Sequence, residues 1–548
     1  MRSNTKNSLV EQRYDFVVVG AGVAGCVLAN RLSECGRYSV CVVEAGGSDA
    51  NFWIQTPLGY GKTFENPDLN WMYTSEASAA MNHRTSYWPR GKVLGGSSAI
   101  NAMVYTRGHP ADYDDWAAQG AVGWNWNEVL PWYLKLENSS RGASAYRGHG
   151  GKLHIADVHQ AYHPLCKRFI QAASELGLPE NSDFNGEHQE GVGYYEITAK
   201  RGRRMSAARA YLHPARSRQN VTLLSKTLAT RILFNEKQAV GIVAKKDKVE
   251  RKIYASRSVI LSAGAINSPQ LLQLSGVGDT NDLSRLGITP IHSNPNVGLH
   301  LQDHLAYTHY YRCTEPTLNN QLYPWWGKLS AGIQYLLARK GPLAVGVNQA
   351  GGFYRSNRAL RRPNLQLYFS PLTYSAPNDD EHRAVKPDPY PGVLMSVSQC
   401  RPKSRGKVAI ASIDPNAAPK IQPNYLENEA DLQELLEGAK FLRDLAGTNA
   451  LSGLIAEETV PGKACASDKQ IQDDIKARAD TVYHPTSTCK IGNSAKNSVV
   501  DNQLRVHGLN GLRVVDASAF PSVPSCNTQA PVYMLAERAA YLILDDQQ

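Results

Sequence analysis

Two polar residues near the C-terminus, His484 and Asn527, have side chains suited to chemistry on a hydroxyl group. They stand in the segments YHPTSTCKIG and PSCNTQAP. An imidazole titrates close to physiological pH, so it suits the removal of a proton from an alcohol. Pro485 restricts the backbone of His484 to extended or turn geometry, which would hold the ring on a fixed loop. Because a lone histidine before proline is more often structural, the prediction depends on what else the chain binds.

A dinucleotide site is predicted within residues 14–44. An apolar run at 16–19 is typical of a buried parallel strand, and Gly20, Gly22 and Gly25 follow in G-x-G-x-x-G spacing. The first glycine permits a tight turn, the second lets the backbone approach a pyrophosphate, and the third lets the next helix pack closely. A second apolar run ends in Glu44, about where an acidic side chain meets a ribose hydroxyl. The alternative is an ordinary glycine-rich turn.

Other chemistries lack their sequence signals. There is no G-x-S-x-G elbow and no histidine–glutamate spacing suited to a metal, which argues against a hydrolase or a metalloenzyme. The nine cysteines include no C-x-x-C pair, so we expect reduced thiols and neither a disulfide framework nor a zinc site. The net charge of +10 is modest for 548 residues. Its densest cluster, Arg201, Arg203 and Arg204, is predicted to be a solvated loop and not a nucleic-acid groove.

The elements that must position the site come from distant parts of the chain. An apolar run at 259–261 leads into a glycine turn and a helical segment, so a nucleotide-type unit recurs far from the first. A third run, 512–515, ends beside Asp516 and precedes a helix for which Thr528 or Asn527 is the expected N-cap. The fold class is therefore α/β, with a discontinuous Rossmann-like domain.

A second domain is predicted from a change of pattern after about residue 305. Residues 221–233 still resemble one strand of the first domain, whereas strand-like pieces at 365–369, 393–397 and 407–410 mix with helices such as 430–445. This pattern predicts an α+β domain with an antiparallel sheet covered by helices. The predicted boundaries are 1–155, 205–304 and 478–548 for the first domain, and 156–204 and 305–477 for the second.

The helical stretch that begins at Trp325 and Trp326 and runs to Leu337 has two interpretations. It is predicted to be a domain helix or a substrate lid, and the alternative is an amphipathic patch at a membrane interface. No run reaches the roughly 18 apolar residues of a membrane span. The polar N-terminus runs directly into the first strand, so no signal peptide is expected. The expected location is the cytoplasm, with peripheral association with the inner membrane as the alternative.

Six motifs together resemble the glucose-methanol-choline (GMC) family of flavin oxidoreductases, most nearly its choline-dehydrogenase-like and medium-chain alcohol dehydrogenase members. The motifs are GAGVAG at 20, GKVLGGSSAINAMVY at 91, GAINSPQLLQLSGVG at 264, VGLHLQDH at 297, HPTSTCKIG at 484 and NTQAPVYMLAE at 527. They occur in the family's order and cover nearly the whole chain.

The resemblance implies FAD in place of NAD. Its ADP half would be held by Gly20, Gly22, Gly25 and Glu44. The pyrophosphate and flavin would be lined by Arg90, Gly95, Ser97, Asn101, Met103 and Val104, with Thr528 near the last helix. Contacts near the adenine and the ribityl chain would come from Ala229, Ala263, Asp516 and Ala517.

Four positions depart from the family's pattern or decide between its variants. In some members a histidine attaches the flavin covalently, and the corresponding residue is Ile100, so noncovalent FAD is expected. His300 stands where the family usually has Asn, Ser487 replaces a common Gly and Gln529 a common Asn. The change at His300 puts one contact in doubt but not the fold, and the changes at Ser487 and Gln529 are expected to reshape the pocket slightly.

The resemblance implies oxidation of a primary alcohol to an aldehyde. His484 would accept the hydroxyl proton, Asn527 would orient the oxygen, and a hydride would pass to flavin N5. The N-terminus of the last helix would stabilise the anionic reduced flavin. Electrons are expected to go to a quinone-type acceptor, and no nucleic-acid partner is expected. The alternatives are an oxidase that uses O₂, a non-redox lyase or photodecarboxylase on the same fold, and a noncatalytic flavin-binding protein.

Overall fold

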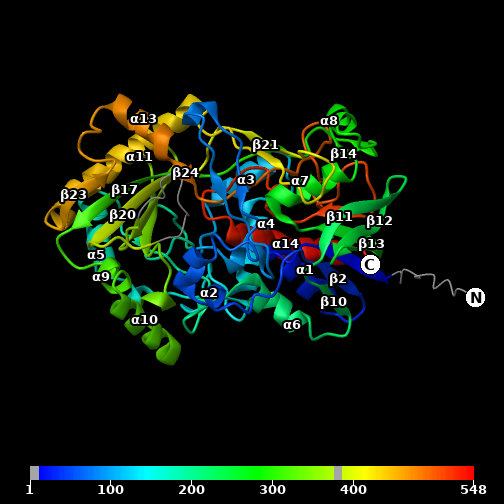
Figure 1. Ribbon diagram of the computed structural model, residues 1–548, viewed down its shortest axis with the longest axis horizontal. Helices are drawn as coiled ribbons and strands as arrows, with labels where there is room; N and C mark the ends of the chain where they lie inside the picture. The colour runs from blue at the N-terminus through cyan, green and yellow to red at the C-terminus, as the bar shows by residue number, and fades with distance from the viewer. Residues whose placement is uncertain (1–11, 375–385, 548) are drawn as a thin grey trace, which may run out of the picture.

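The computed structural model describes residues 12–374 and 386–547, and Figure 1 shows them arranged around two large sheets. Residues 1–11, on which the expectation of no signal peptide rested, lie outside the described part. No helix in the described part is long and apolar enough to cross a membrane. The sheet that carries the dinucleotide motif lies on the right of Figure 1, and the second sheet lies on the left.

The first sheet has the strand order β10–β2–β1–β13–β12–β11, with β25 also paired to β13. Its parallel strands are β10 (Val221–Leu224), β2 (Val40–Val43), β1 (Gln12–Val19), β13 (Val249–Leu261) and β25 (Leu512–Val514). The apolar runs predicted as central strands are buried, as expected for parallel strands covered on both faces. Strand β1 begins earlier than predicted because its polar first half pairs with the middle of β13, from Ile253 onward.

The prediction of one strand over 221–233 is wrong. A turn at Lys226, where φ is +53°, divides it into β10 and β11 (Leu228–Asn235). Strand β10 pairs with β2 at one edge of the sheet, and β11 pairs with β12 (Gln238–Lys246) near the opposite edge. The apolar pattern continues on both sides of the turn, so composition alone did not reveal the break.

The carboxyl ends of three parallel strands meet at one edge of this sheet. Val19 of β1 lies opposite Leu261 of β13, which lies opposite Val514 of β25. Each strand leads into a turn and then a helix: α1 (Val23–Ser33), α7 (Gly264–Leu274) and α14 (Gln529–Asp545). In α/β sheets, ligands bind outside such carboxyl ends. Segments separated by almost 500 residues in the sequence therefore converge on one place.

The second sheet is antiparallel, as predicted, with the order β23–β17–β20–β19–β18–β7 and β24 beside β17. Its strands are β23 (Ile455–Val460), β17 (Leu305–Cys313), β20 (Gly392–Gln399), β19 (Leu365–Ser370), β18 (Ala350–Tyr354), β7 (Gly191–Tyr194) and β24 (Asp480–Thr481). Helices α5 (Leu165–Glu175), α11 (Glu429–Gly447) and α13 (Asp468–Arg478) share one apolar core with it. The segment 407–410 was wrongly assigned to this sheet, because β21 (Gly406–Ala409) pairs with β16 (Leu299–Leu301) and β22 (Lys420–Gln422) instead.

Candidate active site

Two of the three glycines of the first motif, Gly20 and Gly25, occupy positions that no larger residue could take without a shift. Gly20 has φ +100°, and a Cβ there would lie 2.5 Å from the Ser262 carbonyl oxygen. A Cβ on Gly25 would lie 1.8 Å from the Gly20 carbonyl oxygen, because α1 packs directly against the turn. Gly22 is different, since a Cβ there would meet only the Ser262 oxygen, at 3.7 Å. Gly22 therefore presents bare backbone to an open space.

The carboxylates that end β2 and β25 hold the neighbouring turns. Glu44 accepts hydrogen bonds from the backbone N–H groups of Ala21 and Gly46, each at 2.7 Å. Asp516 accepts one from the Gly264 N–H at 2.9 Å. Burial raises the pKa of both carboxyl groups, and these hydrogen bonds oppose that rise. A carboxylate has about four lone-pair sites, so Glu44 retains acceptor capacity for a ribose hydroxyl.

A cavity of about 960 Å³ at this edge brings most of the predicted site residues together. The predicted residues that line it are Gly20, Gly22, Glu44, Arg90, Ser97, Asn101, Met103, Val104, Ala229, Ala263, His484, Asp516, Ala517, Asn527 and Thr528. Gly25 and Gly95 are not in the wall. Gly95 lies behind it, where its N–H donates to the Ala21 carbonyl at 2.8 Å. The volume is at the upper end of the roughly 300–1,000 Å³ of small-molecule sites.

Arg90 brings a positive charge to this cavity. Its Nη2 donates to the Tyr483 carbonyl at 2.8 Å and its Nε to the Pro89 carbonyl at 2.5 Å. Within the described residues, Arg90 forms no ion pair with a carboxylate. Burial lowers its pKa to about 10, so it remains charged at neutral pH. A partly buried cation that is satisfied only by carbonyls fits an anionic ligand, as a dinucleotide phosphate would be.

Arg204 corrects one prediction from the sequence. It was expected in a solvated loop, but its side chain is only 1% exposed and donates to the Asn101 side-chain oxygen at 2.7 Å. Asn101 Nδ2 in turn donates to Gln529 at 2.5 Å. Arg201 and Arg203 remain exposed, as predicted. A turn at residues 201–202 leads into β9 (Arg203–Arg204), and successive residues of a strand face opposite sides, so Arg203 points outward and Arg204 inward. A run of like charges does not reveal this alternation.

His484 is held in a buried loop beside the cavity. Its backbone N–H donates to Asp303 Oδ1 at 2.6 Å, and the hydroxyls of Thr481 and Tyr425 donate to the same carboxylate. Burial raises the pKa of Asp303 to about 6, so it is ionised at pH 7 and accepts all three bonds. The loop is therefore fixed by a carboxylate that comes from the VGLHLQDH motif.

The tautomer of His484 follows from a chain of hydrogen bonds. The Cys400 backbone carbonyl can only accept, so His304, 3.0 Å away, carries its proton on Nε2. Burial lowers the pKa of His304 to about 4, so this ring is neutral and its Nδ1 is an acceptor. His484 Nδ1 lies 3.0 Å from that nitrogen and must donate to it. Nε2 of His484 therefore carries no proton. This nitrogen lies 3.2 Å from Asn527 Nδ2.

The amide of Asn527 is oriented from the other side. Its Oδ1 accepts from Thr106 Oγ1 and from Gln366 Nε2, both at 3.3 Å. This assigns the NH₂ group of Asn527 to the side that faces His484. The two side chains therefore present an unprotonated ring nitrogen and an amide donor to one point of the cavity wall.

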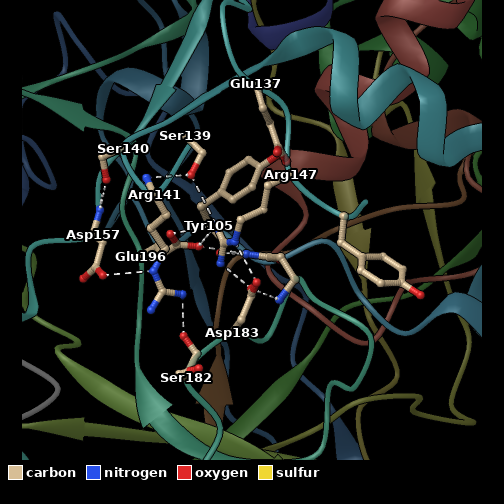
Figure 2. A network of polar contacts seen from close by, with 12 residues as sticks. Tyr105, Glu137, Ser139, Ser140, Arg141, Arg147, Asp157, Ser182, Asp183 and Glu196 are labelled. Atoms are coloured by element: carbon tan, nitrogen blue, oxygen red, sulfur yellow. Dashed lines mark hydrogen bonds and ion pairs between the residues drawn. The ribbon is translucent and has the colours of Figure 1, made fainter. Parts of the chain in front are cut away.

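A buried polar network braces Thr106. Glu137 accepts from the Tyr105 hydroxyl at 2.5 Å and from Arg107 Nε at 2.7 Å, so the residues on both sides of Thr106 are fixed. Arg107 and Glu137 are almost fully buried. Figure 2 shows the network continuing outward through Ser139, Arg147, Asp183 and Glu196. The network therefore fixes the backbone around Thr106, and the Thr106 hydroxyl donates to Asn527 from a defined position.

The positions that depart from the family's pattern lie in different surroundings. Ile100 lines the cavity and offers no nucleophilic atom for a covalent bond to a ligand. His300 is not a lining residue, and its ring is 3.4 Å from the Asn296 side chain. Ser487 has φ +73°, a conformation that glycine adopts without strain and serine does not. The exchange of glycine for serine therefore leaves local backbone strain next to the His484 loop.

Four residues of this arrangement were not predicted from the sequence: Asp303, His304, Thr106 and Gln366. The sequence offered a sign of Asp303 and His304, because they end the VGLHLQDH motif immediately before β17. It offered no sign of Thr106 and Gln366. Their contacts with Asn527 join positions that are 421 and 161 residues apart.

Comparisons with known proteins agree on one family. The GMC oxidoreductase profile for the N-terminal region matches residues 14–306, and the profile for the C-terminal region matches residues 402–536. An oxygen-dependent choline dehydrogenase of Vibrio vulnificus (strain YJ016) is 42% identical over 541 residues, covering 98% of this chain and 95% of the relative. An alcohol dehydrogenase (acceptor) of Pseudomonas putida is 42% identical over 535 residues, covering 97% of this chain and 96% of the relative.

A similar solved structure is a formate oxidase variant from Aspergillus oryzae RIB40, in which FAD modification was studied. It is 27% identical and superimposes with a TM-score of 0.90, covering 98% of this chain and 99% of the formate oxidase chain.

Proposed function

The chain belongs to the GMC oxidoreductase family, and from this premise we propose that it oxidises an uncharged primary alcohol to the aldehyde. Membership makes it a flavin-dependent oxidoreductase of alcohols or choline, with FAD as its cofactor. The observation that carries the proposal is the unprotonated Nε2 of His484 beside the Asn527 amide in the cavity wall. We propose these two residues as the catalytic pair.

The residues around the cavity fit FAD. The glycine turn and Glu44 would hold its ADP half, Arg90 would face its negative charge, and Asp516 would lie at the ribityl chain. Noncovalent binding follows from Ile100, which has no group to form a bond. When bound, FAD supplies the acceptor for a hydride from the alcohol carbon.

The proton is handled by the chain itself. His484 Nε2 takes the proton from the substrate hydroxyl, and the Asn527 amide donates to the substrate oxygen and orients it. The resulting imidazolium keeps its second proton on Nδ1, and this N–H continues to donate a hydrogen bond to Nδ1 of His304. Asp303 holds the loop through the His484 backbone and does not touch the ring.

The proposed substrate class rests on the wall that the second sheet contributes. Alternate residues of β17, β19 and β20 point into the cavity, as the two-residue period of a strand requires. These residues are Ala306, Thr308, Tyr310, Tyr368, Leu394 and Ser396. All six are neutral, and burial raises the pKa of both tyrosines. The wall formed by β17, β19 and β20 is therefore neutral, which favours an uncharged alcohol. Two charged residues, Asp480 of β24 and Arg478, also line the cavity. The tyrosine faces, through cation–π contact, and the Asp480 carboxylate make choline a specific alternative.

We propose a quinone as the electron acceptor, because one 42%-identical relative is named as an alcohol dehydrogenase (acceptor). Another relative is named as oxygen-dependent, so an oxidase that makes H₂O₂ is the second candidate.

An anaerobic visible spectrum of the purified protein, taken in the dark before and after addition of each alcohol, tests the function. We expect an uncharged primary alcohol to bleach the flavin and choline to bleach it more slowly. Slow return of colour in air, with fast return on adding a soluble quinone, would support the dehydrogenase. A flavin that neither class of alcohol bleaches would contradict the proposal and favour a lyase or photodecarboxylase.

His304 is proposed to act as a positioning residue through the tautomer of His484. The change His304→Leu removes the acceptor for Nδ1–H, and we expect it to slow flavin reduction by about 10–100-fold. His304→Asn keeps an oxygen near that position and should recover much of the loss. Stopped-flow reduction at pH 7, with FAD content measured in parallel, checks both variants. Equal losses in the two variants would assign His304 a merely structural role.

The pH dependence of flavin reduction should lack a step near 6.5. Burial, with the positive charge of Arg90, holds the pKa of His484 well below its usual 6.5. The neutral ring is the active base, so activity is lost only as pH falls through that depressed pKa. Between pH 8 and pH 6 we therefore expect the limiting rate to change by no more than about twofold. A tenfold fall per pH unit beginning at about 6.5 would contradict this assignment.

A further inference from the structure

Helix α10 (Trp325–Ala338) presents its apolar face to solvent. The exposed residues and their exposed fractions are Trp325 72%, Trp326 63%, Leu329 56%, Ile333 49%, Leu336 56% and Leu337 83%. At about 100° per residue, these six side chains occupy one arc of roughly 120°. Ala331 and Tyr335, the buried residues of the helix, point to the opposite side. An ordinary surface helix buries its apolar arc, and α10 exposes it.

The apolar surface continues onto a second short helix. The ring of Phe52 in α2 (Phe52–Gln55) lies 6.1 Å from the ring of Tyr335. Phe52 and its neighbour Trp53 are 43% and 39% exposed. We call these two residues, together with the six exposed residues of α10, the α10 patch. In Figure 1, α10 lies at the lower edge of the molecule, away from the first sheet.

Cations lie on and beside helix α10. Residues 316–378 include no Asp or Glu but seven Lys or Arg, of which Arg355 and Arg362 form ion pairs with Glu190 and Asp115. Lys328 and Lys340 are exposed, and neither is ion-paired with a described residue. The loop that carries Arg201 and Arg203 packs beside the end of α10, because a Cβ on Gly202 would lie 2.3 Å from the Arg339 carbonyl oxygen. An apolar surface rimmed by unneutralised cations matches an anionic lipid surface.

We propose that the α10 patch docks this protein onto an anionic lipid bilayer, with the two tryptophans at the headgroup level. Tryptophan is favoured there because its ring is apolar and its N–H is polar. A second copy fits less well, because a two-fold contact would place the same cations opposite one another. The proposal does not depend on the substrate class or the acceptor.

The docked face is close to the cavity. On the inner side of α10, Ala331 packs in one apolar cluster with Val347, and Tyr60 and Ala102 pack against that cluster. Val347, Tyr60 and Ala102 also line the cavity. Docking would therefore bring a wall of the cavity to the bilayer surface, where lipid-soluble molecules are concentrated.

Co-sedimentation of the FAD-loaded enzyme with vesicles tests the proposal. We expect binding to phosphatidylcholine vesicles that contain phosphatidylglycerol, and weaker binding to phosphatidylcholine alone or at raised salt. The variant Trp325→Ser/Trp326→Ser/Leu337→Ser should lower the partition coefficient at least about tenfold. Its FAD content and its alcohol oxidation with a soluble dye should remain at the wild-type level, since the changed side chains are exposed.

A matched control is Ile413→Ser, which removes an apolar side chain that is 64% exposed and lies outside the α10 patch. It should bind vesicles like the wild type. Failure of the wild type to bind either vesicle, or equal binding by the triple variant, would overturn the proposal. So would a dimer in size-exclusion chromatography that the triple variant dissociates, because the patch would then belong to a second copy. If the wild-type enzyme binds anionic vesicles but does not oxidise alcohols with the soluble dye, the result would count against the proposed function and not against the docking proposal.

Discussion

Replacing His484 by alanine is expected to slow flavin reduction by the alcohol by about 10²–10⁴-fold, with FAD content unchanged. The change removes the one ring nitrogen at this point of the cavity that is held unprotonated by its neighbours. It leaves the backbone bond to Asp303 in place, so the loop should keep its shape. Anaerobic stopped-flow measurement of flavin bleaching, at saturating alcohol, gives the limiting rate directly.

A second histidine provides the control for this experiment. His300→Asn changes a ring that does not line the cavity, at a left-handed position that asparagine tolerates. We expect its rate to stay close to that of the wild type. If His484→Ala also reduces flavin at the wild-type rate, another group takes the proton and the proposed mechanism fails.

Adding one carbon at Gly25 is expected to abolish stable FAD binding. In Gly25→Ala the new Cβ would lie 1.8 Å from the Gly20 carbonyl oxygen, so either α1 or the glycine turn must move. Overpacking of this kind costs about 1–3 kcal/mol or more in folding stability. The displaced turn is the one that leaves Gly22 bare toward the cavity, so we expect FAD affinity to fall at least about 100-fold.

The ratio of flavin to protein absorbance after gel filtration, together with titration of the apoprotein with FAD, measures this effect. Gly447→Ala is a matched control, because a Cβ there would have nothing within 4 Å and its φ is not left-handed. We expect that variant to bind FAD normally. Normal FAD binding by Gly25→Ala would show that the turn adapts, and it would contradict the packing argument.

Local pattern was enough to predict the first sheet's centre. The apolar runs that end at Val19, Val43 and Leu261 became parallel strands because a strand buried on both faces needs continuous apolar residues. The antiparallel second sheet also followed from its alternating pieces. Pattern failed where a turn interrupted an apolar stretch at Lys226, and where the Arg204 side chain turned inward beside two exposed arginines.

The geometry of the site could not be predicted in the same way. The sequence suggested His484 and Asn527 separately, and nothing in it placed their side chains 3.2 Å apart. The protonation state of His484 depends on a carbonyl of Cys400, reached through His304, in two other segments of the chain. Such long-range contacts produce no repeating pattern in the sequence, so only the three-dimensional structure reveals them. The catalytic roles of these residues and the domain boundaries stay predictions.

The strand order of the first sheet also constrains how the protein is made. A ribosome releases the glycine turn of β1 almost 500 residues before β25 and the start of α14. Because Asp516, Asn527 and Thr528 in the cavity wall come with these later segments, a nascent chain cannot close that wall until they have emerged. Cofactor capture is therefore expected only after that point, and the apolar surface of the earlier segments stays without its packing partners until then. A stop codon anywhere before β25 would consequently yield a chain without these three wall residues, however much of the fold it retained.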